Sequence, residues 1–201
     1  MLNVAMKAAA LLACWAAPQV ALAAESASPA QRLAVMSVEA TPARLVQYAA
    51  QGDGNVVGLL LQAGVDVNAA DPVRQVSALH NAAAQGHLEL MKKLLAQGAQ
   101  PDAADWRGTT PLITAAYYGQ LEAARLLLQR GAAVNQVSKE GMTPLVAAVY
   151  SGKDAMVDLL LAHGASPALP AEGERPLAVA QRAQRSAMSA ALQRQSVGGG
   201  Q

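Results

Sequence analysis

Glycines recur in this chain at a fixed interval, and this interval is the feature that most limits its fold. Two series run in parallel, each spaced 34, 33 and 33 residues apart. The first series is Gly52, Gly86, Gly119 and Gly152, and the second is Gly64, Gly98, Gly131 and Gly164. A period of roughly 20–50 residues is typical of stacked repeats, in which each unit buries its apolar face against its neighbours. The chain is therefore predicted to be a row of small units and not a body with one large core.

The unit that spans residues 105–137 shows the pattern within one period most completely. The turn Thr110-Pro111-Leu112 places a proline in the first turn of a helix, where its missing N–H breaks no hydrogen bond. The pair Ala115-Ala116 is small enough for that helix to approach a neighbour closely, and Gly119 suits the left-handed residue after a helix end. A second helix is predicted by the run Leu126-Leu127-Leu128 before Gly131. Each unit is thus predicted to be two short amphipathic helices and a polar finger.

These residues resemble the ankyrin-repeat family. The resemblance implies an all-α solenoid of about four helix-turn-helix repeats plus a C-terminal cap. The two ends depart from the pattern, since Ala43-Arg44-Leu45-Val46 stands where Thr-Pro-Leu-His is typical, and Gln184 replaces a glycine. The first unit is therefore expected to be a capping repeat with a more polar outer face. The repeats are placed at about residues 41–70, 71–104, 105–137 and 138–170, the cap at 171–195 and a flexible tail at 196–201.

The first residues are typical of an export signal. Lys7 gives a positive start, residues 8–17 are apolar, and Ala21-Leu22-Ala23 offers the small side chains that signal peptidase accepts. Residues 1–23 are therefore predicted to be a cleaved signal peptide, which removes the only cysteine, Cys14. The alternatives are an uncleaved anchor and a lipoprotein, because Leu11-Leu12-Ala13-Cys14 resembles a lipid-attachment sequence. Membrane contact is expected only if Cys14 is lipidated. Residues 24–40 are interpreted as a linker that forms a short helix against the first repeat.

Composition and motifs give no sign of catalysis. The chain is 53% apolar and 14% charged, with a net charge of +1, so no basic surface for nucleic acid is indicated. His80, His87 and His163 lack a spacing that would place them together as metal ligands, and Glu172 with Glu174 is interpreted as a solvated loop. Neither a phosphate-binding loop nor a nucleophile elbow is present. No enzyme activity, cofactor, metal or small-molecule substrate is expected. The resemblance implies instead that His80 ties neighbouring fingers by hydrogen bonds.

The few aromatic side chains gather where ankyrin repeats contact their partners. The resemblance implies that the finger tip and the two residues before the first-helix glycine face a partner. Of the aromatic residues outside the leader, all but Tyr48 occupy such positions. Tryptophan, tyrosine and arginine are common anchors of interfaces. The alternative is that the tyrosine rings pack over the adjacent repeat and contact nothing else. The partner-binding strip is predicted to contain Trp106, Arg107, Tyr117, Tyr118, Lys139, Glu140, Met142, Tyr150 and Ser151, and to continue backward through Gln75, Val76, Ala84 and Gln85.

The resemblance implies a non-catalytic protein–protein interaction module whose concave surface binds a partner protein. The leader predicts export, with the bacterial periplasm as the expected location, and a secreted chain as an alternative. The chain is similar to exported bacterial ankyrin-repeat proteins, some of which are associated with a periplasmic catalase. Other hypotheses are a secreted effector that binds a host protein, a self-associating structural repeat protein, and an enzyme, which a ligand or metal bound in the groove would support.

Overall fold

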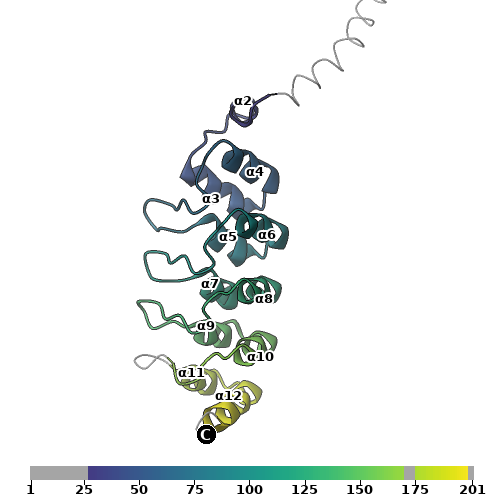
Figure 1. Cartoon of the computed structure of the whole chain (residues 1–201). Coiled ribbons are helices and arrows are strands. Elements are labelled where there is room, and N and C mark those ends of the chain that lie inside the picture. Colours follow the sequence, from purple (N-terminus) through teal and green to yellow (C-terminus); the bar gives the residue numbers. More distant parts are fainter. Residues whose placement is uncertain (1–26, 170–174, 199–201) are drawn as a thin grey trace, which may run out of the picture.

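The computed structural model describes residues 27–169 and 175–198. Within these residues the chain forms helices stacked in pairs along one row, with loops that project from one side (Figure 1). An isolated antiparallel bridge between Ala70 and Ser77 is the one extended pairing in this part of the chain. The expected all-α ankyrin solenoid is therefore confirmed.

The row contains five helix pairs, preceded by the short helix α2 (Pro29–Val35), which packs against α4. The first helices of successive pairs contact one another and form the inner column, beside the projecting loops, or fingers (Figure 1). They are α3 (Pro42–Gln51), α5 (Ala78–Gln85), α7 (Pro111–Tyr118), α9 (Pro144–Ser151) and α11 (Pro176–Arg182). The second helices form the outer column, and they are α4 (Gly54–Gln62), α6 (Leu88–Ala96), α8 (Leu121–Gln129), α10 (Asp154–Ala162) and α12 (Ser186–Gly198).

Local sequence explains where the first helices begin and end. Four of them start after a hydroxyl residue whose side chain accepts a hydrogen bond from the backbone N–H three residues later. This satisfies an N–H that the first helical turn cannot pair. The same four helices end at left-handed glycines, and Gln184 adopts the same region after α11 with φ 54. The hydroxyl caps are Thr41, Ser77, Thr110 and Thr143.

The core is a continuous row of leucines and alanines between the two columns. The alanine pairs of α5, α7 and α9 are fully buried where neighbouring first helices meet, because a larger side chain would separate the backbones. Each second helix supplies a fully buried leucine or methionine to the same row. α2 joins the row through Leu33, which is also buried.

A side-chain contact also joins successive helix pairs, and it recurs between all five pairs. The side chain directly after the left-handed residue that ends each later first helix covers the first-helix glycine of the preceding repeat. The ring of His87 lies over Gly52, and the amide of Gln120 lies over Gly86. Gln120 Nε2 also donates a hydrogen bond of 3.1 Å to the carbonyl of Ala84, and His87 Nε2 lies 3.3 Å from the carbonyl of Ala50. Lys153 and Arg185 cover the next two glycines in the same way.

Gly58 differs from these glycines and gives a stability prediction. It lies inside α4, and a Cβ added there would meet no atom within 4 Å. Glycine costs a helix interior about 0.5–1 kcal/mol relative to alanine. Gly58→Ala is therefore expected to raise the free energy of unfolding by about 0.5–1 kcal/mol, measured by urea denaturation. Gly86→Ala is the matched control and should lower it, because φ at Gly86 is 73° and its Cβ would lie 2.6 Å from Gln120 Oε1. An equal effect of both substitutions would contradict this reasoning.

The predicted signal peptide (1–23) and Cys14 lie outside the described residues, as do Glu172, Glu174 and the end of the predicted tail. No helix in the described residues is long and apolar enough to cross a membrane.

Candidate functional site

The fingers and the inner helices enclose a hollow of about 680 Å³ on the concave face. It lies where the finger of residues 105–109, the helix α7 and the finger of residues 138–142 meet. Six residues of the predicted strip line this one hollow together, and Val76 and Ala84 of the preceding repeat line it as well. The six are Trp106, Arg107, Tyr117, Tyr118, Glu140 and Met142.

The aromatic rings of the hollow are exposed. Trp106 is 52% exposed, and Tyr117 and Tyr118 are 52% and 60% exposed. The two tyrosine rings meet edge to face, with centroids 5.4 Å apart. About half of each ring surface is therefore free to contact a partner, whether or not the rest packs over the adjacent repeat. Exposed aromatic side chains of this size are the type that anchors an interface.

Arg107 links two fingers through a hydrogen-bonded ion pair with Glu140, which we call the clasp, and it lies over the ring of Trp106. Its Nε donates a hydrogen bond of 2.7 Å to Glu140 Oε1, and Nη2 donates to the second carboxylate oxygen. The guanidinium carbon lies 5.7 Å from the centroid of the Trp106 ring, within the range of a cation–π contact. The hydrogen bond to Glu140 raises the pKa of Arg107 above its ordinary value. The two finger tips are thus joined beside the exposed indole.

Backbone contacts also hold the finger of Trp106 in place. The N–H of Trp106 donates to the carbonyl of Arg74 at 3.1 Å, and the N–H of Lys139 donates to the carbonyl of Arg107 at 2.9 Å. Lys139 Nζ donates to the carbonyl of Trp106 at 2.8 Å. Within the finger, one carboxylate oxygen of Asp105 accepts hydrogen bonds from two backbone N–H groups. The finger is therefore ordered before a partner arrives, which lowers the entropic cost of binding.

His80 is buried beneath the hollow and performs the expected structural role. Its Nε2 lies 2.9 Å from the carbonyl of Thr109 in the next finger, so the predicted tie between fingers is confirmed. The N–H of Ser77 donates to Nδ1 at 3.2 Å. Because a backbone N–H can only donate and a carbonyl can only accept, the ring is neutral with its proton on Nε2. Burial lowers the pKa of His80, and the hydrogen bond to Thr109 and the charge of Asp105 partly oppose this shift.

The other three residues of the predicted strip, Lys139, Tyr150 and Ser151, do not line this hollow. Ser151 Oγ donates to the carbonyl of Ala148 within its own helix. Tyr150 is 41% exposed and lines a separate hollow of about 130 Å³ with Arg182 and Arg185 of the cap. Arg182 Nη2 donates a long hydrogen bond of 3.4 Å to Tyr150 Oη, so this ring partly fits the packing alternative. Sequence reasoning did not include the two arginines in the strip, although Arg182 occupies the position in the cap that corresponds to Tyr150.

Metal-ligating side chains do not cluster in the described residues. No group of three or more histidine, cysteine, aspartate or glutamate side chains in this part of the chain is arranged to hold an ion. His87 is engaged in covering Gly52, and His163 Nδ1 lies 2.8 Å from the carbonyl of Leu159 in its own helix.

Comparison with known proteins agrees with this architecture. The family pattern described as "Ankyrin repeats (3 copies)" matches residues 45–138, and "Ankyrin repeat" matches residues 140–171. Together these matches cover more than half of the chain, which therefore belongs to the ankyrin-repeat family. The chain is also similar to cortactin-binding protein 2 of Rattus norvegicus, at 42% identity over 72 residues. That match covers 35% of this chain and only 4% of the rat protein. Ankyrin repeats indicate a protein–protein interaction module.

Proposed function

We propose that the chain binds a partner protein in the concave hollow and holds it there without performing chemistry on it. The observation that supports this most directly is the set of exposed rings of Trp106, Tyr117 and Tyr118 around one hollow of about 680 Å³. The clasp between Arg107 and Glu140 and the backbone bonds between fingers keep the hollow ordered. An ordered surface with exposed aromatic anchors can bury large apolar areas at low entropic cost.

Two substitutions test this surface. Trp106→Ala and Tyr118→Ala are each expected to weaken partner binding by about 2 kcal/mol, or roughly 30-fold in Kd. The partner is captured by crosslinking in the living cell and identified by mass spectrometry, and its Kd is then measured by calorimetry with the purified protein. Val73→Ala is the matched control, because Val73 is an exposed apolar side chain of a neighbouring finger that does not line the hollow. If the folded double variant retained full affinity, this surface would not be the binding site.

We also propose that the chain is exported to a bacterial periplasm, where it supports a partner enzyme such as a catalase. The motivation is the signal-like sequence at residues 1–23 and the similarity to exported bacterial ankyrin-repeat proteins. Mass spectrometry of the chain purified from its host should find a mature protein that begins at Ala24 or one residue later. A chain that begins at a lipid-modified Cys14 would indicate the lipoprotein alternative. Periplasmic catalase activity that is the same with and without the chain would contradict the role in supporting that enzyme.

A further inference from the structure

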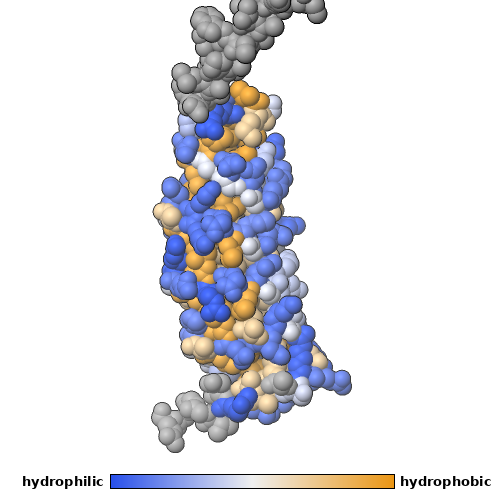
Figure 2. Space-filling view, turned by 90° about the vertical axis from the view of Figure 1, so that its right-hand side faces the viewer, coloured by the Kyte–Doolittle hydropathy of each residue, from blue (hydrophilic) through white to orange (hydrophobic). Residues whose placement is uncertain are grey.

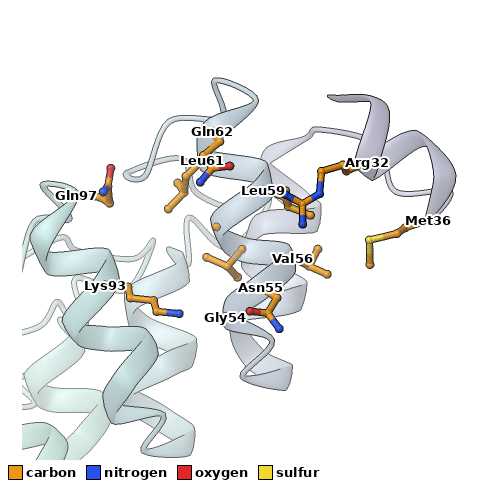
Figure 3. A pocket seen from close by; sticks show the side chains of 12 residues that line it. Arg32, Met36, Gly54, Asn55, Val56, Leu59, Leu61, Gln62, Lys93 and Gln97 are labelled. Carbon is orange, nitrogen blue, oxygen red and sulfur yellow. The ribbon is translucent and has the colours of Figure 1, made fainter. Parts of the chain in front are cut away.

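A second groove lies on the outer side of the molecule, away from the concave hollow. It has a volume of about 710 Å³ and lies along α4, between α2 on one side and α6 on the other (Figure 3). Its lining residues come from these three helices and from the residues directly after α2 and α6, and the fingers do not contribute. Residues of the ankyrin pattern form only part of this groove, because α2 precedes the first repeat.

The floor of the groove is largely apolar, with Asn55 and Gln62 near the two ends of α4. Val56, Leu59 and Leu61 of α4 line it, and two glycines of the same helix, Gly54 and Gly58, stand one turn apart in it. A Cβ at Gly58 would meet no atom within 4 Å, so the backbone of α4 is open to solvent there. Two glycines four residues apart allow another helix to approach closely, because no side chain separates the two backbones.

The rim of the groove is also apolar on the side of α2. Met36 lines the groove and is 50% exposed, and the preceding Val35 is 88% exposed. On the face formed by the outer helices, apolar surface extends to the end of the molecule where α2 and α4 lie (Figure 2). The expected polar outer face of the first repeat is therefore interrupted by an apolar groove. An exposed apolar patch with polar residues around it is typical of an interaction site.

The charges of the groove have one sign. Arg32 reaches toward α4 from α2, and Lys93 reaches toward it from α6, so that the two cations stand on opposite sides of the apolar floor (Figure 3). The ammonium of Lys93 would lie 3.4 Å from a Cβ at Gly54, beside the N-terminus of α4. Among the described residues, no acidic side chain lines the groove. Glu89 of α6 forms its ion pair with Lys92 at 2.6 Å and does not line the groove.

We propose that this groove docks an amphipathic α-helix of a partner protein, with acidic residues on both flanks of the apolar stripe of that helix. The apolar stripe fits the floor formed by α4, and the open backbone at Gly58 permits close packing of the two helices. The acidic flanks complement Arg32 and Lys93. Because the groove and the concave hollow share no lining residue, the chain can hold two binding segments at the same time.

Two synthetic peptides of about 18 residues, or about 27 Å of helix, test the docking of a helix. Both carry the same leucine and alanine stripe, and they differ only in glutamate or lysine on the flanks. We expect the glutamate peptide to bind the full chain about tenfold more tightly than the lysine peptide, as measured by fluorescence anisotropy. Equal affinities, or no binding of the glutamate peptide, would overturn the proposal. Binding to anionic phospholipid vesicles without binding to the glutamate peptide would also overturn the proposal, because the groove would then be a membrane contact.

Substitutions in the groove test whether the peptide binds there. The Cβ that Gly58→Leu adds would meet no atom within 4 Å, and the leucine would occupy the groove. We expect it to weaken binding of the glutamate peptide at least about tenfold while the circular dichroism spectrum of the chain remains unchanged. The double substitution Arg32→Glu and Lys93→Glu should reverse the preference between the two peptides. Lys92→Glu is the matched control and should preserve the preference, because Lys92 is a neighbour on the same helix that does not line the groove. Unchanged binding by both the Gly58→Leu and the double variant would overturn the proposal.

Discussion

Replacing Leu127 by alanine is expected to lower the free energy of unfolding by about 3 kcal/mol. Leu127 is fully buried in α8, which packs against α7 of its own pair and against the outer helices on both sides. Truncation removes its contacts with all of these neighbours and leaves a cavity in the middle of the row. Urea denaturation followed by circular dichroism measures the loss. Because each unit of a solenoid is stabilised mainly by the adjacent units, we also expect a broader unfolding transition.

Leu128→Ala is the matched control for this prediction. Leu128 is the next residue of the same helix, and it is only partly buried against the core. Its truncation removes a similar number of atoms but leaves a site that water can fill, so the expected loss is about 1 kcal/mol or less. Equal losses at the two positions would mean that the units of the row do not share one continuous core.

The repeat pattern predicted most of the fold because the signals for each unit are local. The hydroxyl residue before each first helix and the glycine after it lie within one short segment, and both act through the backbone of that segment. Thr110 and Gly119 show this for α7. Burial of the leucine runs follows from their spacing in the same way.

The candidate site was predicted only in part, because its chemistry depends on side chains from different repeats. Exposure of Trp106 and Tyr118 followed from their positions within a repeat. The clasp between Arg107 and Glu140 joins residues 33 positions apart, and it depends on the distance between two finger tips. The outer groove could not be predicted from the repeat pattern, since it requires that Leu33 fix α2 beside α4.

Replacing His80 by leucine is expected to lower the free energy of unfolding by about 2 kcal/mol, because the buried N–H of Ser77 would lose its partner and the carbonyl of Thr109 would keep only the N–H of Asp105. Leucine fills similar space but leaves the N–H of Ser77 and the carbonyl of Thr109 without the ring. Ile113→Leu is the matched control, since Ile113 occupies the corresponding position of the next repeat and is buried with no polar group to pair. Its expected loss is below about 1.5 kcal/mol. A similar loss in both variants, measured by urea denaturation, would show that the imidazole contributes only by packing.

The same histidine should make the stability of the chain depend on pH. Its pKa in the folded protein is lower than the ordinary value, chiefly because burial disfavours the charged ring, and the charge of Asp105 opposes this effect only in part. As pH falls below the ordinary pKa of about 6.5, the unfolded chain binds a proton that the folded chain excludes, so stability is lost until the pH has passed the folded pKa. Above pH 6.5 this contribution is constant. The difference in free energy of unfolding between the original chain and His80→Leu should therefore shrink as the pH is lowered from about 8 to 5. A difference that instead grew toward low pH would mean that the folded protein holds the ring in its charged form, with Nδ1 protonated against the N–H of Ser77.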